Sequence, residues 1–139
     1  MAGLEYRASI GAVSPEPAPD MVATDAYYAV AKTGDAVVQD TDGKIVAAAA
    51  NAATIFGVCA GRELAITGQT NKRVKVRTSS GTRYQVTVSA GTPKVGSSYG
   101  LTADFKLNAS AAGTAVKVVE IDKQGNVFVT INKANVGGA

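Results

Sequence analysis

Side chains that could perform catalysis or bind a metal are sparse in this sequence. Its 139 residues include one cysteine, Cys59, and neither histidine nor tryptophan. Without histidine there is no Ser-His-Asp triad, no Cys-His dyad and no imidazole ligand for a metal. The carboxylates are scattered over separate segments, and no spacing singles out a pair for general acid–base catalysis. We therefore expect a protein that is not an enzyme and that has no cofactor and no metal site.

The single thiol lies in an apolar run, residues 55–60. A catalytic thiol needs an electropositive, partly exposed setting and a base nearby, whereas a thiol among apolar residues is normally buried and inert. One cysteine also cannot form an intramolecular disulfide. We interpret Cys59 as a buried core residue. The first 19 residues lack the pattern of a secretion signal, so we expect synthesis in the cytoplasm.

The sequence Asp40-Thr41-Asp42-Gly43 resembles the start of a calcium loop. Calcium needs six to eight oxygen ligands, and the next twelve residues supply no carboxylate and only Asn51 as an oxygen-bearing amide. Aspartate and glycine at these positions are also typical of a β-turn. The turn is the interpretation that we adopt.

Positive charge is concentrated in one part of the chain, although the net charge is only +3. Val74 and Val76 alternate with basic residues, and after the Ser79-Ser80-Gly81 turn the sequence continues toward Val86 and Val88. Alternation places successive side chains on opposite faces of a strand, so we predict a hairpin with one apolar and one cationic face. The candidate charged interface consists of Lys72, Arg73, Lys75, Arg77 and Arg83.

Three interpretations of this cationic face remain open. It could be a solvated outer surface, it could contact an acidic protein surface, or it could bind nucleic acid. Single-stranded nucleic acids also need aromatic side chains on which bases stack, and Tyr84 is the only one nearby. We keep a nucleic-acid-binding β-barrel that uses the basic hairpin of residues 72–84 as an alternative interpretation of the protein's function.

Short β-branched segments separated by Gly, Asn, Asp and Ser predict an all-β domain from residue 27 onward. We expect a small single β-barrel or a β-sandwich-like domain, with a β-tulip as a possible form, and at most one or two short helices. We interpret the alanine-rich residues 47–53 as a strand end that leads into a loop or one short helix. The predicted strands are 27–31, 36–39, 44–47, 55–59, 63–67, 72–78, 83–89, 98–102, 106–108, 116–122 and 127–132.

The first 26 residues differ in character from the rest. Prolines alternate with other residues in Ser14-Pro15-Glu16-Pro17-Ala18-Pro19-Asp20, and proline removes backbone donors and favours extended conformations. We predict an extended arm over residues 1–26, a β domain over 27–133 and a flexible tail over 134–139. No run of residues is long and apolar enough to span a bilayer, so a membrane partner is not expected.

The two halves of the predicted domain share a weak rhythm. Gly34–Val38, Gly43–Ile45 and Ile55–Val58 are loosely matched by Gly96–Gly100, Phe105–Leu107 and Val116–Val119. Residue identity is low, and similar β-hairpin patterns could produce the same rhythm without a duplication.

Together, the proline-rich arm, the segments Gly34–Val38, Asp42–Val46 and Ile55–Val58 and the similar rhythm of the second half resemble the capsid decoration, or cement, proteins of tailed bacteriophages. The resemblance covers residues 33–131 and implies a structural virion protein on the outer capsid surface. Such a protein stabilises the head by clamping adjacent major capsid proteins, commonly as a homotrimer. The chain departs from the lambda-type proteins in lacking Trp and His and in having its basic hairpin.

In that family the N-terminal arm becomes ordered on the capsid by adding a strand to the major capsid protein. The resemblance therefore implies that the arm of this chain docks on the capsid lattice. The residues that it assigns to docking are Leu4, Tyr6, Ile10, Val13, Pro15 and Pro17.

Overall fold

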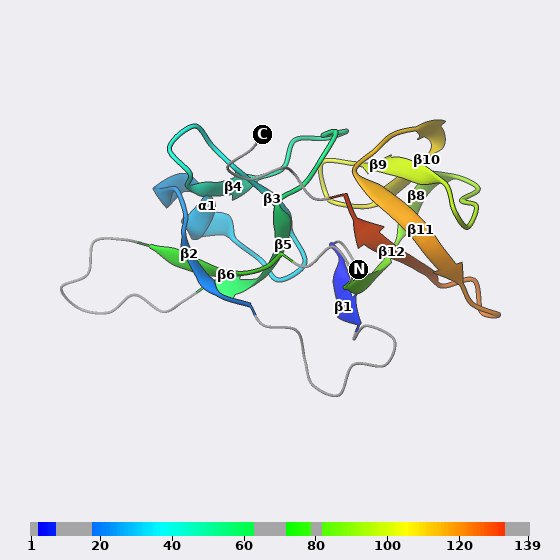
Figure 1. Ribbon diagram of the computed structural model, residues 1–139, viewed down its shortest axis with the longest axis horizontal. Coiled ribbons are helices and arrows are strands. Elements are labelled where there is room, and N and C mark those ends of the chain that lie inside the picture. Colours follow the sequence, from blue (N-terminus) through cyan, green and yellow to red (C-terminus); the bar gives the residue numbers. More distant parts are fainter. Residues whose placement is uncertain (1–2, 8–17, 63–71, 79–81, 133–139) are drawn as a thin grey trace.

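The computed structural model describes residues 3–7, 18–62, 72–78 and 82–132. The described chain is mostly β, as predicted, and forms two sheets and one short helix (Figure 1). One sheet contains, in spatial order, β1 (Glu5–Arg7), β7 (Arg83–Val86), β12 (Val127–Ile131), β11 (Val116–Ile121), β9 (Ser98–Leu101), β10 (Leu107–Ala112) and β8 (Val88–Gly91). The other contains β2 (Asp20–Val22), β6 (Arg73–Arg77), β5 (Gly57–Arg62), β3 (Ala36–Gln39) and β4 (Ile45–Ala47).

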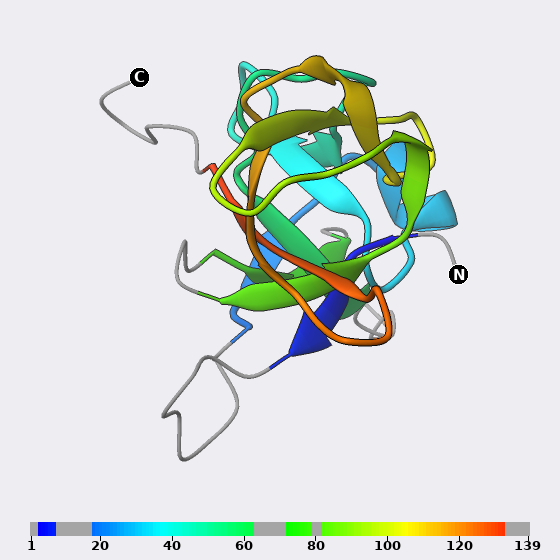
Figure 2. The same cartoon turned by 90° about the vertical axis from the view of Figure 1, so that its right-hand side faces the viewer.

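The larger sheet curls into a nearly closed barrel, which Figure 2 shows from one end. Strand β8 follows β7 after a single residue, Thr87, and pairs in parallel with β10 at the far side of the sheet. The chain thereby brings β7, β12, β11, β9, β10 and β8 into a nearly closed ring. The five-stranded sheet is joined at its ends in the same way by a single parallel bridge between Ala23 and Ile45.

Helix α1 (Asp25–Val30) occupies a segment that the sequence predicted as the strand 27–31, so that prediction is wrong. The Thr24 side chain caps the helix by accepting a hydrogen bond from the Tyr27 N–H at 3.2 Å, and Asp25 places a negative charge in the first turn. These end signals outweigh the strand preference of Tyr and Val. Among the described residues, no helix is long and apolar enough to cross a membrane.

Two predicted hairpins are confirmed. Strand β3 pairs with β4 across residues 40–44, and β11 pairs with β12 across residues 122–126. In the first turn one carboxylate oxygen of Asp40 accepts hydrogen bonds from the backbone N–H groups of Asp42 and Lys44, both at 2.9 Å. In the second turn one carboxylate oxygen of Asp122 likewise accepts hydrogen bonds from the backbone N–H groups of Gln124 and Asn126. The Asp40 segment is thus the predicted turn, and the alanine-rich residues beyond β4 form a loop.

The predicted hairpin between residues 72 and 88 is wrong. Strand β6 pairs with β5 and β2 in one sheet, whereas β7 pairs with β12 and β1 in the other. Val74 and Val76 are buried as predicted, but their cluster differs from the one that contains Tyr84 and Val86. The alternation of valines with polar residues indicated which side chains are buried. It did not indicate which of the two buried clusters each strand contributes to.

The two halves of the chain have the same topology. We call residues 18–78 the first repeat and residues 82–132 the second repeat. The strand order β2-β6-β5-β3-β4 of the first corresponds to β7-β12-β11-β9-β10 of the second, and every adjacent pair within these five is antiparallel. A register shift after Cys59 in β5 has its counterpart after Val118 in β11.

The correspondence extends to single hydrogen bonds. Gly34 N–H donates to the Cys59 carbonyl at 2.8 Å, and Gly96 N–H donates to the Val118 carbonyl at the same distance. Both glycines have left-handed backbones, with φ near 100° and 90°, a conformation that glycine adopts without the steric cost of a side chain. The first two segment pairs of the weak rhythm therefore coincide with a structural repeat. The third pair does not, because residues 55–58 correspond to residues 114–117 and not to Val116–Val119.

Two clusters of buried side chains form the core. The smaller lies inside the first repeat, and the larger fills the second repeat and extends between the two. Backbone hydrogen bonds join the repeats, from Ile55 N–H to the Asn132 carbonyl at 3.0 Å and from Asn51 N–H to the Leu101 carbonyl at 2.8 Å. The repeats lie side by side in Figure 1 and share one continuous apolar contact.

The described parts of the predicted N-terminal arm belong to the sheets. Strand β1 pairs with the edge of β7, and β2 pairs with β6. Leu4 is 1% exposed in the larger cluster, and its N–H donates to the Gly34 carbonyl at 2.8 Å. Helix α1 spans the predicted boundary at residue 26. Residues 133–139, which include the predicted tail, lie outside the described residues.

Replacing Leu4 by alanine should lower the free energy of unfolding by about 2–5 kcal/mol, because it leaves a cavity between the repeats. Urea denaturation measures this change. The control is Val30→Ala, since Val30 is 62% exposed and its truncation should change the stability by less than about 0.5 kcal/mol. Equal effects of the two substitutions would show that the N-terminal strand is not part of the core.

Candidate interaction surface

The basic residues predicted to form one interface are divided between two surfaces. Arg73 and Lys75 lie exposed on β6, directly after Lys72, and Arg77 is half-buried at the end of that strand. Arg83 begins β7 in the other sheet. The five residues therefore do not form the single cationic face that a hairpin would have produced.

Arg83 is engaged within the second repeat. Its guanidinium forms an ion pair with Glu120 of β11 and lies 5.3 Å from the centre of the Phe128 ring of β12. An arginine held by a carboxylate and an aromatic ring has little freedom to meet a partner. We assign Arg83 a role in holding β7, β12 and β11 together.

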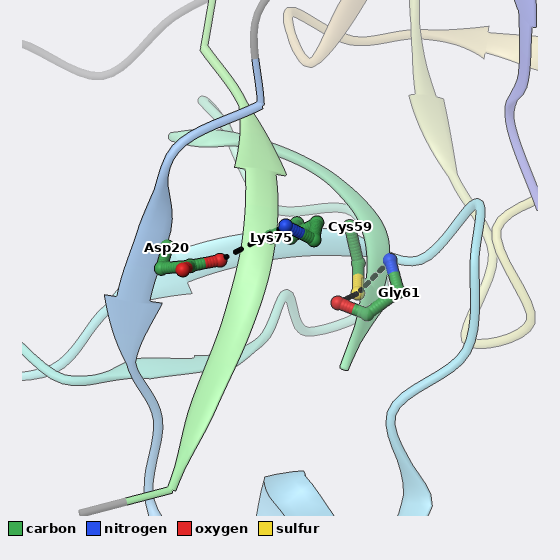
Figure 3. Close-up of polar contacts among 4 residues, drawn as sticks. All are labelled: Asp20, Cys59, Gly61 and Lys75. Carbon is green, nitrogen blue, oxygen red and sulfur yellow. Dashed lines mark hydrogen bonds and ion pairs between the residues drawn. The ribbon is translucent and has the colours of Figure 1, made fainter. Parts of the chain in front are cut away.

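The exposed charges of β6 lie beside the edge strand β2. Lys75 Nζ is 3.4 Å from the Asp20 carboxylate, and both side chains are about half exposed, as Figure 3 shows. Ion pairs at such exposed positions contribute little to stability. Arg73 lies opposite Val22 on the same two strands. We call the surface formed by Lys72, Arg73 and Lys75 with β2 the β2–β6 surface.

A second group of cations surrounds an aromatic ring next to this surface. The Arg62 guanidinium lies 5.4 Å and Lys72 Nζ 5.8 Å from the centre of the Tyr28 ring. Arg62 also donates to the carbonyls of Tyr28 and Ala29, at 3.0 and 3.4 Å, and so satisfies acceptors near the end of α1. Sequence reasoning missed Arg62 and Tyr28, because only the fold brings these distant positions together.

The only aromatic residue expected near the basic strand is unavailable for stacking. Tyr84 is fully buried in the larger cluster. A base stacks on an exposed ring face, so the aromatic part of the predicted nucleic-acid site is absent at this position.

The predicted docking residues fall into two groups. Leu4 is a core residue, 1% exposed, and Tyr6 lies in β1 opposite Tyr84. The remaining four lie outside the described residues: Ile10, Val13, Pro15 and Pro17.

Cys59 is 1% exposed, which confirms that it is a buried thiol. Its sulfur accepts a hydrogen bond from Gly61 N–H at 3.4 Å, at the register shift in β5 (Figure 3). Nearby, the Tyr27 hydroxyl donates to the Asp35 carboxylate at 2.9 Å. Burial raises the pKa of the Cys59 thiol and, more strongly, the pKa of the Tyr27 hydroxyl. In the described residues no cluster of three or more His, Cys, Asp or Glu side chains could hold a metal ion.

The raised pKa values predict that the protein loses stability in alkali. The folded state holds these protons more tightly than the unfolded state, so their contribution is complete below the ordinary pKa of each group and declines above it. We expect the free energy of unfolding to fall above about pH 8.5, the ordinary pKa of a cysteine thiol, and more steeply above about pH 10, the ordinary pKa of a tyrosine hydroxyl. Cys59→Val, which introduces the residue found at the equivalent position 118, should flatten that decline, and an unchanged slope would exclude the thiol as its source.

Comparisons of this chain with protein-family models, with curated proteins and with solved structures found no match to any of them.

Proposed function

We propose that this chain is a structural protein of a tailed-phage virion that binds the outside of the capsid and clamps adjacent major capsid proteins, as a trimer. The proposal rests on the resemblance carried by the segments Gly34–Val38, Asp42–Val46 and Ile55–Val58. In the structure these segments are β3, the end of the first turn with β4, and the approach to β5. They lie on the strands that recur in the second repeat.

The observation that supports the proposal most strongly is the repeat itself. Two sheets of the same topology are joined by a continuous apolar cluster and by backbone hydrogen bonds. A packed core transmits force without a hinge between its parts. A rigid body with two similar ends suits a role in which neighbouring subunits of a shell are held at a fixed separation.

The proline-rich segment has a revised place in this proposal. Both of its ends are built into the fold, at β1 in one sheet and β2 in the other. We propose that residues 8–17 dock on the capsid between these two anchors, and not as a free N-terminal arm. Many copies on one lattice would strengthen weak binding of each segment through multivalency.

Binding of nucleic acid has less support as an alternative. Its predicted hairpin is divided between two sheets, and Tyr84 is buried. A gel-shift titration at low salt addresses it directly, because phosphate contacts make binding strongly dependent on salt. Retardation that disappears with added salt would favour this alternative.

The clamp proposal predicts that the full-length protein co-sediments with expanded empty heads that lack it. Binding should saturate at a fixed ratio and raise the temperature at which the shells dissociate. Light scattering with and without shells gives the number of chains in each bound unit. Failure of the full-length protein to bind such heads would overturn the proposal.

Replacing Ile10, Val13, Pro15 and Pro17 together by serine should leave the fold intact and weaken binding to the heads at least about tenfold. This variant keeps Leu4 and both strands, whereas deletion of residues 1–20 would remove part of the core. The matched control replaces two exposed apolar residues elsewhere, Val30 and Val95, by serine. Equal binding by both variants would contradict a docking role for the segment.

A further inference from the structure

Strand β1 is an addition to the repeat that it covers. The pairing of β8 with β10 brings the barrel of the second repeat close to closure, and β1 pairs only with the outer edge of β7. In the first repeat the corresponding place lies beside residues 18–20, and within the described residues no strand fills it. The topology of a repeat therefore does not require this strand, so β1 is a separable element.

The place that β1 fills selects the chain that enters it. Leu4 is 1% exposed in the larger cluster, and its N–H donates to the Gly34 carbonyl at 2.8 Å. A Cβ on Gly3 would lie 3.0 Å from the same carbonyl oxygen, so this position favours glycine. Glu5 then begins the ladder opposite Gln85 of β7. We call the place formed by Gly34, β7 and the larger cluster the acceptor site, and it fits an extended segment in which glycine precedes leucine.

The chain that reaches the acceptor site comes from another part of the fold. Strand β1 lies on the second repeat, whereas the chain that follows it enters the first repeat at β2 (Figure 1). Residues 8–17 connect the two strands, and every second residue from 15 to 19 is proline. Proline-rich sequences favour an extended backbone of about 3.1 Å per residue and act as semi-rigid spacers. A stiff spacer directly before β2 favours delivery of β1 to a neighbouring copy over a return to its own chain.

We propose that the acceptor site of each copy takes residues 3–7 of a neighbouring copy, so that this strand is exchanged around a trimer. Exchange of a terminal strand keeps every contact that the strand makes within one chain and alters only the connection. Backbone pairing with β7 supplies affinity, and burial of Leu4 supplies specificity. The number of three copies rests on the function proposed above, whereas the exchange itself does not depend on a capsid.

A disulfide across the ladder distinguishes exchanged strands from unexchanged ones. Glu5 and Gln85 lie opposite each other, and opposite Cα atoms of antiparallel strands are about 4.5–5.5 Å apart, which a disulfide can span. The full-length variant with Glu5→Cys and Gln85→Cys, oxidised and run on a denaturing gel without reductant, should migrate mainly as a covalent trimer. Linked dimers would support exchange and contradict the number three. Monomers alone, with the disulfide inside one chain at every protein concentration, would overturn the proposal.

The matched control places the two cysteines at Val38 and Val46, which lie opposite each other across the β3–β4 turn. Both positions belong to one hairpin, so this disulfide should form within one chain and give monomers. The natural Cys59 stays in place in both variants because it is 1% exposed. Trimers confined to the first variant would support exchange, whereas trimers of both variants would count against it.

Leu4→Ala tests the exchange without added cysteines, and it decides the question if the cysteine variants do not fold. Under exchange this substitution removes a buried contact between copies, so the dissociation constant of the trimer should rise at least about tenfold. Light scattering over a concentration series measures it, and Val30→Ala, at a position that is 62% exposed, should leave it unchanged. A Leu4→Ala variant that unfolds at a lower temperature but keeps the molar mass of the original protein at each concentration would overturn the proposal.

Two combinations of results separate this inference from the proposed function. If linked trimers form but the protein does not co-sediment with empty heads, the clamp fails and the exchange remains. If the protein binds the heads while every Glu5→Cys, Gln85→Cys disulfide lies within one chain, the exchange fails and the clamp remains.

Discussion

The apolar contact between the two repeats is the interaction on which the rest of the structure depends. A unit of about 60 residues buries only about 60% of the surface that its unfolded chain exposes and is marginally stable alone. Ile55 and Val58 of the first repeat lie in the same cluster as Val116 and Ile131 of the second. Because only 6% of the residues are aromatic, this contact is made mostly of small aliphatic side chains, which require close approach of the two sheets.

The N-terminal strand is part of this contact. Leu4 is buried between the repeats, and Gly3 and Gly34 approach so closely that a Cβ on Gly3 would lie 3.0 Å from the Gly34 carbonyl oxygen. Such contacts are tighter than nine in ten real Cβ contacts, so a side chain at either glycine would require the facing backbone to shift by a few tenths of an ångström. The beginning of the chain therefore contributes to the core.

The all-β class and two of the hairpins were predictable from the sequence, because their signals are local. Asp40 and Asp122 each begin a turn. In both turns the aspartate side chain accepts a hydrogen bond from a backbone N–H of the turn itself. The pairing of β6 and β7 was not predictable, since alternating valines look the same whichever core they enter. The exposure of Arg73 and Lys75 followed from alternation, whereas the cluster of Arg62, Lys72 and Tyr28 depends on contacts between distant segments.

The repeats keep their backbone geometry even where their residues differ. Gly43 and Phe105 occupy equivalent turns, and both have a left-handed backbone, with φ of 77° and 62°. This conformation costs phenylalanine about 1–2 kcal/mol relative to glycine. The Phe105 side chain is buried in the larger cluster, and burial of a side chain of this size contributes about 1.5–3 kcal/mol. The turn geometry is therefore retained because the pairing of β9 with β10 requires it, while the residues that fill the turn respond to the local core.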